Sequence, residues 1–190
     1  MSDRNNKTFT AIIPARGDSK RLVNKNIKTM INKPLVAWTI ESAIKSGIFK
    51  TIWLNSEDEN ILSVGSYYDI GTYKRPLELG SDYTSTEAVI REQLSNMTKT
   101  VDYVMVLQPT SPTRKVSDIV KFAELAGDYV LSSCNMEFNR NGSIYVAPWD
   151  YMLYSIKWVD SVRLVTDDID IDTIKDWEIA ECFLKERQSV

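Results

Sequence analysis

Short apolar segments alternate with amphipathic segments along this chain, and this alternation limits the folds that it can adopt. The apolar segments are rich in β-branched and aromatic residues, as buried strands are. They are residues 9–13, 51–54, 102–107, 128–133, 143–147 and 161–165. Helices are expected from Pro34 to Gly47, over 57–66, after Thr84, over 117–126 and over 173–186. Thr84, in a capping box with Glu87, and Ser117 are the N-caps expected for the third and fourth of these helices. Because the strands are apolar throughout, we predict a mainly parallel sheet covered by helices on both faces.

Length and charge narrow the class of protein. The chain has 190 residues and no repeat or linker, so we expect one domain over residues 1–190, with 1–8 as a loose tail. A net charge of -3 argues against a general nucleic-acid binder, and no apolar run is long enough to span a bilayer. Cys134 and Cys182 have no metal-type spacing and are expected to be free thiols in the cytoplasm.

The chain contains no histidine, which removes several kinds of chemistry. Serine or cysteine nucleophiles paired with histidine are excluded, and so are zinc sites built on imidazole. Any acid–base step falls to Asp, Glu, Lys or Tyr.

The loop after the first strand carries the charge expected of a phosphate site. Residues 12–26 read IIPARGDSKRLVNKN, with four cations and a glycine in the polar part. Cations and exposed backbone N–H groups bind phosphate, and ligands of parallel sheets lie beyond the carboxyl ends of strands. The loop matches neither the P-loop nor the dinucleotide pattern. The alternative is a solvated basic loop.

Two further polar segments complete a set of candidate site residues. In LQPTSPTR (107–114), Gln108 could contact a base, Thr110 and Ser111 a base or ribose, and Arg114 an anion; the alternative is a rigid turn before a helix. In TDDIDIDT (166–173), carboxylates two residues apart point to one face of an extended chain and could share Mg²⁺. The alternative there is an acidic loop with Asp172 or Thr173 as a helix N-cap.

Together, a cationic loop, a base-reading loop and paired carboxylates are the components of a nucleotidyltransferase. The same segments resemble the motifs of the acylneuraminate cytidylyltransferase family, the CMP-sugar-acid synthetases. The resemblance rests on IIPARGDSKRLVNKN, KRPLELGSDYTST, LQPTSPTR, NRNGSIY and IDIDTIKDWEIAE, which follow in the family's order from residue 12 to 181.

The resemblance implies a Rossmann-like three-layer α/β/α nucleotidyltransferase fold and a reaction. Family members couple CTP to the anomeric hydroxyl of a 2-keto sugar acid and release pyrophosphate, with Mg²⁺ as cofactor. The matching positions imply catalytic roles for Arg16, Lys20, Lys25 and Asp172. They imply nucleotide binding by Ala15, Arg16, Gly17, Asn26, Ser81, Gln108, Thr110 and Ser111, substrate binding by Arg140 and Asn141, and metal binding by Asp170 and Asp172.

The sequence departs from the family pattern in three places. Asp18 and Arg21 replace family glycines, and Asp18 adds negative charge to the loop. A salt bridge from Asp18 to Arg21 or Lys20 could cancel that charge; the alternative is a lower affinity for CTP. Glu57 stands where the family has a shorter carboxylate. The largest departure is a gap, because SSCNMEFNRNGSIY joins two segments that several dozen residues separate in the family. That insert supplies much of the acceptor pocket and of the homodimer interface, so the family dimer is not expected in its usual form.

Two other functions remain open from the sequence. One is a CTP-binding protein whose catalysis is lost or depends on a partner. The other is a nucleotidyltransferase that uses another nucleotide or acceptor.

Overall fold

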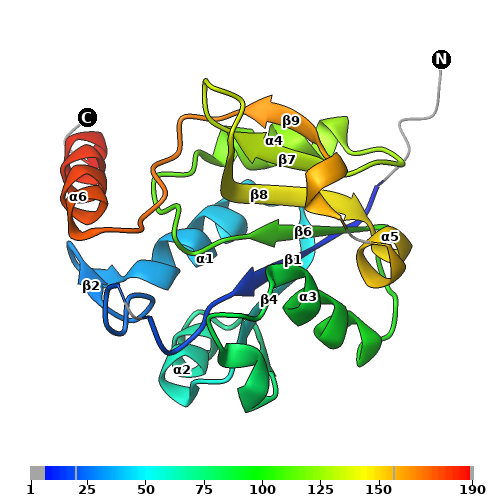
Figure 1. Cartoon of the computed structure of the whole chain (residues 1–190), viewed down its shortest axis with the longest axis horizontal. Coiled ribbons are helices and arrows are strands. Elements are labelled where there is room, and N and C mark those ends of the chain that lie inside the picture. Colours follow the sequence, from blue (N-terminus) through cyan, green and yellow to red (C-terminus); the bar gives the residue numbers. More distant parts are fainter. Residues whose placement is uncertain (1–6, 20, 156, 189–190) are drawn as a thin grey trace.

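The computed structural model describes residues 7–19, 21–155 and 157–188. Its main sheet has seven strands in the order β5-β4-β1-β6-β8-β7-β9 (Figure 1). Strands β5, β4, β1 and β6 are parallel to one another, β8 is antiparallel to both β6 and β7, and β9 is parallel to β7. The predicted mainly parallel sheet is therefore confirmed.

The expected strands and helices occur in the expected order, and β2, β3 and α5 are additional elements that the sequence did not predict. The strands are β1 (Phe9–Pro14), β2 (Thr29–Met30), β3 (Lys33–Pro34), β4 (Phe49–Ser56), β5 (Gly71–Lys74), β6 (Tyr103–Leu107), β7 (Leu131–Cys134), β8 (Arg140–Pro148) and β9 (Val162–Val165). The helices are α1 (Leu35–Ser46), α2 (Glu59–Tyr67), α3 (Thr86–Ser95), α4 (Val116–Leu125), α5 (Trp149–Tyr154) and α6 (Ile174–Gln188), with short 3₁₀ turns η1 (Leu77–Gly80) and η2 (Trp158–Asp160).

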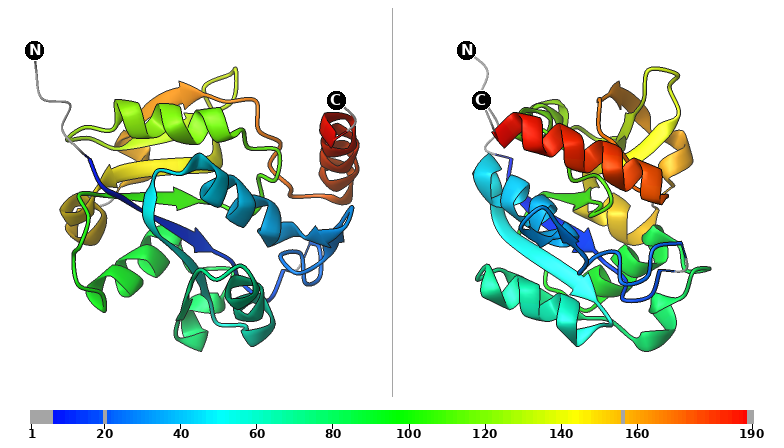
Figure 2. Two further views of the ribbon diagram at one scale, coloured as in Figure 1. Left: turned by 180° about the vertical axis from the view of Figure 1, so that it is seen from behind. Right: turned by 90° about the vertical axis from the view of Figure 1, so that its left-hand side faces the viewer.

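Helices cover both faces of the sheet, which gives three layers. Ala11 and Ile13 of β1 pack on the side of α1, α2 and α4, whereas Ile12 packs with α3 and α5 on the other side. Figure 1 shows α3 and α5 on the near side, and the view from behind in Figure 2 shows α1 and α4. This alternation follows from the two-residue period of a strand.

Helix α6 lies at one end of the molecule, beside the β2–β3 hairpin (Figure 2). It belongs to a third apolar cluster, in which Trp177 and Leu184 pack with Leu22 of the first loop and with Ile171. The segment just before α6 is thereby packed against the loop after β1. Two segments that are far apart in the sequence are brought to one edge of the sheet.

Two predicted helix caps are wrong. Helix α3 is capped by Ser85, whose Oγ accepts the Ala88 N–H, rather than by Thr84. Helix α4 begins after Lys115 without a side-chain cap, so Ser117 lies inside its first turn. At α6, Thr173 Oγ1 and Asp176 exchange hydrogen bonds as a capping box, which agrees with the capping role considered for Thr173.

Residues 1–6 of the expected tail lie outside the described residues, while Thr8 donates its N–H to Asp102 at 2.9 Å. In the described ranges, no helix combines the length and the apolar character that crossing a membrane requires.

Candidate active site

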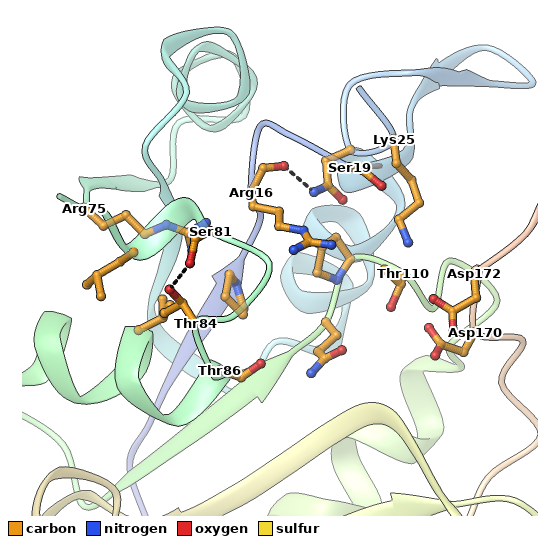
Figure 3. Close-up of a pocket in the computed structure, with 16 residues that line it drawn as sticks. Arg16, Ser19, Lys25, Arg75, Ser81, Thr84, Thr86, Thr110, Asp170 and Asp172 are labelled. Atoms are coloured by element: carbon orange, nitrogen blue, oxygen red, sulfur yellow. Dashed lines mark hydrogen bonds between the residues drawn. The ribbon is translucent and has the colours of Figure 1, made fainter. Parts of the chain in front are cut away.

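A pocket of about 230 Å³ lies at the carboxyl ends of β1 and β6, as expected for a parallel sheet (Figure 3). Its wall is mostly polar. Eight of the residues singled out from the sequence line it: Arg16, Lys25, Asn26, Ser81, Gln108, Thr110, Asp170 and Asp172. They come from four separate segments, so the fold brings together what the sequence keeps apart.

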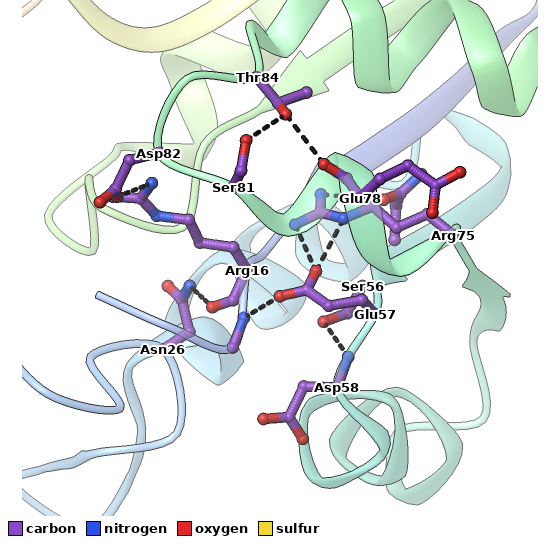
Figure 4. A network of polar contacts seen from close by, with 12 residues as sticks. Arg16, Asn26, Ser56, Glu57, Asp58, Arg75, Glu78, Ser81, Asp82 and Thr84 are labelled. Atoms are coloured by element: carbon purple, nitrogen blue, oxygen red, sulfur yellow. Dashed lines mark hydrogen bonds and ion pairs between the residues drawn. The ribbon is translucent and has the colours of Figure 1, made fainter. Parts of the chain in front are cut away.

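The loop after β1 enters the pocket through Arg16. Ala15 is buried beneath it and donates its N–H to the Asn55 carbonyl at 2.9 Å. Arg16 forms an ion pair with Asp82, the residue after the pocket residue Ser81 (Figure 4). The Gly17 N–H, expected to face the nucleotide, instead donates to Glu57 Oε1 at 2.7 Å.

Glycine is needed at position 17 for space. A Cβ there would stand 2.7 Å from Asp58 Oδ2 and 2.8 Å from Asp58 Cβ, which is closer than packing allows. The loop therefore approaches the start of α2 more closely than any residue with a side chain would permit.

Lys25 and Asn26 lie deeper in the same loop. The Lys25 ammonium donates to the Ile171 carbonyl at 2.6 Å, and the Asn26 amide donates to the Arg16 carbonyl at 2.8 Å. Burial lowers the pKa of Lys25, although the carboxylates of Asp172 and Asp170 act in the opposite direction. Lys25 is thus a partly desolvated cation between the first loop and the acidic segment.

The two predicted metal ligands lie next to each other on the pocket wall (Figure 3). Burial raises the pKa of Asp170, the Asp172 charge adds to this effect, and the Thr110 side chain and Lys25 oppose it. Asp170 Oδ1 is buried without a hydrogen-bond partner in the described part of the chain. A buried carboxylate oxygen without a partner is a costly feature that a bound cation would relieve.

Asp172 is about half exposed and pairs with Arg21, with Arg21 Nη1 at 3.0 Å from Asp172 Oδ1. Asp18 was considered as the partner of Arg21, but Arg21 pairs with Asp172 instead. Lys20, the other partner considered for Asp18 and a predicted catalytic residue, lies outside the described residues.

The loop after β6 contributes Gln108 and Thr110 to the pocket. Ser111 does not line it, because its hydroxyl is fully buried and has no partner among the described residues. Arg114 is also buried, so the anion-binding role considered for it does not fit. Its guanidinium bonds Ser143 Oγ at 2.9 Å, Thr39 Oγ1 at 3.1 Å and the Gln108 carbonyl at 2.6 Å.

Arg75 lines the pocket and was not identified from the sequence as a site residue. Glu57 Oε2 accepts from Arg75 Nε at 2.8 Å and lies 2.6 Å from Nη2, and both side chains are nearly inaccessible (Figure 4). Since Glu57 also holds the Gly17 N–H, it connects the first loop to Arg75. Arg75 precedes a proline in the KRP motif, and this position was the only sequence feature that could have identified it as a site residue. Ser19, Thr84 and Thr86 are further pocket residues that sequence reasoning did not select.

The two predicted substrate-binding residues lie elsewhere. Arg140 lines a separate pocket with Arg91 and Lys157. Asn141 points inward, where its amide donates to Thr166 Oγ1 at 2.8 Å and its Oδ1 accepts from the Ser133 hydroxyl. Asn141 therefore supports the start of β8.

The two carboxylates of the pocket suit a cation that also has ligands from outside the protein. In the portion that the structure describes, no three His, Cys, Asp or Glu side chains are grouped to hold a metal. Mg²⁺ is commonly bound by one or two carboxylates, with waters and substrate phosphates completing its octahedron. Asp170 and Asp172 together with the orphaned Asp170 Oδ1 fit this pattern.

Comparison with known proteins gives relatives that are named as cytidylyltransferases or CMP-sugar-acid synthases. The pseudaminic acid cytidylyltransferase of Campylobacter jejuni is 34% identical over 152 residues, covering 71% of this chain and 65% of the relative. The N-acylneuraminate cytidylyltransferase of Escherichia coli is 38% identical over 131 residues, covering 69% and 31%. The chain thus matches less than two thirds of the length of either relative.

A third relative bears on the gap seen in the sequence. The CMP-N,N'-diacetyllegionaminic acid synthase of Legionella pneumophila is 27% identical over 224 residues, covering 94% of this chain and 97% of the relative. Because that alignment is longer than the 190 residues of this chain, the relative contains segments without a counterpart here.

Solved structures share the fold. CMP:2-keto-3-deoxy-manno-octonic acid synthetase, complexed with CTP, has a TM-score of 0.74 at 13% identity and covers 95% of this chain and 99% of its own. A nucleotidyl transferase from Methanothermobacter has a TM-score of 0.75 at 13% identity, with 94% and 99% covered. The sequence profile described as cytidylyltransferase matches residues 10–145, which is more than half of the chain. The chain belongs to the cytidylyltransferase family.

Proposed function

We propose that this protein is a Mg²⁺-dependent cytidylyltransferase that transfers CMP from CTP to the anomeric hydroxyl of a 2-keto sugar acid and releases pyrophosphate. The observation that carries the proposal is one pocket lined by three cations, Arg16, Lys25 and Arg75, and by a pair of carboxylates. The names of the sequence relatives support an acidic sugar as acceptor, and a fold neighbour contains CTP. The free thiols of the chain are in keeping with a cytoplasmic reaction.

The cytidine would lie against the loops after β6 and η1. Gln108 can donate and accept through its amide, which suits the adjacent amino and carbonyl groups of cytosine. Thr110 and Ser81 offer hydroxyls within the same pocket. Buried Arg114 holds the Gln108 carbonyl from below, so the loop that carries these groups is fixed before the nucleotide binds.

The triphosphate would lie along Arg16, Lys25 and Arg75, with Asn26 supporting the loop. Positive charge fixed in place before the reaction stabilises the charge that develops on departing pyrophosphate, and such stabilisation is usually the largest single contribution to phosphoryl-type transfer. Burial of Lys25 strengthens its effect, because a desolvated cation acts in a lower dielectric.

Asp170 and Asp172 would hold Mg²⁺. When bound, the ion supplies positive charge to the phosphate oxygens and neutralises the two carboxylates. Asp172 must then exchange its contact with Arg21. Because the chain has no histidine, we also assign Asp172 as the acceptor of the proton from the attacking hydroxyl.

Pyrophosphate release tests this function. The purified chain is incubated with Mg²⁺, CTP and, in turn, N-acetylneuraminic, pseudaminic, legionaminic and 2-keto-3-deoxy-manno-octonic acid. We expect turnover with at least one acid, its loss on chelation, and CTP preferred over UTP, GTP and ATP. No turnover with any acid would contradict the proposal.

A second candidate function is CTP binding without catalysis. It is favoured by the Arg21–Asp172 ion pair, which engages a metal carboxylate, and by the missing acceptor segment. Calorimetry separates the two functions, because CTP binding together with absent turnover selects the second.

A further inference from the structure

Arg21 borders the pocket of the candidate active site. Ser19 and Lys25, which flank Arg21 in the loop after β1, line this pocket, and so does Asp172, its ion-pair partner. The Arg21 side chain is 67% exposed, and its Nη1 lies 3.0 Å from Asp172 Oδ1. The motif that the loop resembles has glycine at position 21, so this ion pair is a feature of the present chain and not of that motif.

Apolar packing beside the two charges holds their backbones in place. Leu22 follows Arg21 in the chain. Ile171 precedes Asp172, and the side chains of Leu22 and Ile171 are buried in the same apolar cluster. The Ile171 N–H also donates to the Thr110 carbonyl at 2.8 Å. Because both backbones are anchored, the exposed guanidinium can leave the carboxylate by a change of side-chain rotamer and still remain beside the pocket.

Arg21 also lies near the other cations of the loop. Burial is the main cause of the lowered pKa of Lys25, and the charge of Arg21 contributes more to this shift than that of Arg16. Arg21 is therefore close enough to Lys25 for the two side chains to face one polyanion. A triphosphate that lies along Arg16 and Lys25 would offer Arg21 a second anionic partner, next to the carboxylate that it now holds.

We propose that Arg21 pairs with two anions in turn: with Asp172 while the pocket holds no nucleotide, and with the triphosphate once CTP and Mg²⁺ are bound. This inference rests on the proposed function. In the nucleotide-free protein the guanidinium occupies one of the two carboxylates assigned to the metal, so the metal alone must compete with it. With CTP present, the same guanidinium can donate two parallel hydrogen bonds to phosphate oxygens. One ion pair is thus exchanged for another, and neither Arg21 nor Asp172 loses a partner.

The exchange gives Arg21 opposite effects on two binding steps. Arg21 opposes binding of the metal alone, and because an exposed ion pair is weak, its removal should tighten Mg²⁺ binding to the nucleotide-free protein only about threefold. Arg21 favours binding of CTP with Mg²⁺, and loss of a charge-assisted contact to phosphate should weaken this step about tenfold. Damage to the loop would weaken both steps, so effects of opposite sign are specific to the exchange.

The test measures two dissociation constants by thermal-shift titration, the Kd of Mg²⁺ for the nucleotide-free chain and the Kd of CTP at saturating Mg²⁺. Arg21→Gln should lower the Kd of Mg²⁺ about threefold and raise the Kd of CTP about tenfold. Arg21→Lys keeps the charge without the planar fork, so both constants should fall between those of the intact chain and Arg21→Gln. Arg163→Gln is the matched control and should change neither constant, because Arg163 bonds the Phe138 carbonyl and is not a residue of the pocket.

A Kd of Mg²⁺ that is not lower in Arg21→Gln, including one too weak to measure in both proteins, would overturn this inference. An unchanged Kd of CTP in the same variant, or equal changes in Arg163→Gln, would do so as well. In each of these cases the proposed function stands if the intact chain binds CTP with Mg²⁺ and releases pyrophosphate. Absence of CTP binding by the intact chain would instead remove the proposed function and this inference together.

Discussion

At the scale of single residues, Asp170 and Lys25 are charged side chains whose surroundings oppose their charged forms. Burial raises the pKa of Asp170 and lowers that of Lys25. The charge of each residue partly offsets the pKa shift of the other, yet burial remains the largest cause of both pKa shifts. Such residues stay in a fold at a cost to stability, which is common where ligands bind.

Asp170→Asn should raise the stability of the nucleotide-free protein. A carboxyl whose folded pKa is raised stabilises the protein when protonated, and this stability is lost as pH rises through the folded pKa. Near neutral pH the substitution should therefore raise Tm, and the gain should shrink as pH falls towards about 4. Activity should fall about 100-fold or more. Calorimetric Tm values across pH, compared with Asp167→Asn as a control, check this; a lower Tm at neutral pH would contradict it.

Lys25 should limit activity on the alkaline side. Because its pKa is lowered, Lys25 loses its charge at a lower pH than an ordinary lysine. In Lys25→Arg the guanidinium stays protonated, so the alkaline fall in kcat/KM for CTP should move to higher pH even if the maximum is lower. Lys25→Gln should lose most activity at every pH. A pH–rate profile that is identical in the intact chain and Lys25→Arg would assign the alkaline fall to another group.

At the scale of secondary-structure elements, Arg114 connects the loop after β6 to β8 and α1. Complete burial lowers its pKa to about 10, and its donors reach Ser143, Thr39 and the Gln108 carbonyl. Arg114→Lys cannot reproduce this fork and leaves buried acceptors unpaired, so we expect a loss of about 3 kcal/mol in unfolding free energy. Urea titration measures it, with Arg163→Lys as the exposed control. A loss below about 0.5 kcal/mol, typical of surface changes, would show that water replaces the guanidinium.

The elements also show what could be read from the sequence. Strand and helix positions and the order of polar loops were predictable, because apolar runs and turn residues determine them locally. The capping residue of α3 was missed because Thr84, Ser85 and Thr86 are chemically similar, and only the chain path selects Ser85. Arg75 and Glu57 were missed as a pair because their contact depends on the β4–β5 pairing. The anion-binding role considered for Arg114 failed because burial is not visible in a motif.

At the scale of the whole molecule, three residues of the pocket wall form ion pairs with other segments. Arg16 with Asp82, Arg21 with Asp172, and Arg75 with Glu57 each join segments from different parts of the chain. A triphosphate with Mg²⁺ must compete with at least the exposed pairs. Binding of the metal and binding of the nucleotide should therefore be coupled, because the positive charge of the ion offsets the negative charge of the triphosphate.

Thermal unfolding of the whole chain tests this coupling. We expect one transition, because helices α1 to α5 pack on one sheet and α6 packs on the loop after β1. Mg²⁺ with CTP at about 100 times Kd should raise Tm by about 5–10 °C. CTP with chelator, and CMP with Mg²⁺, should each give a much smaller rise, since CMP lacks the phosphates that face Arg16 and Lys25. Asp170→Asn should lose most of the metal-dependent part while keeping its higher starting Tm. An equal rise with and without metal would mean that the cations alone hold the triphosphate and that the two carboxylates serve another purpose.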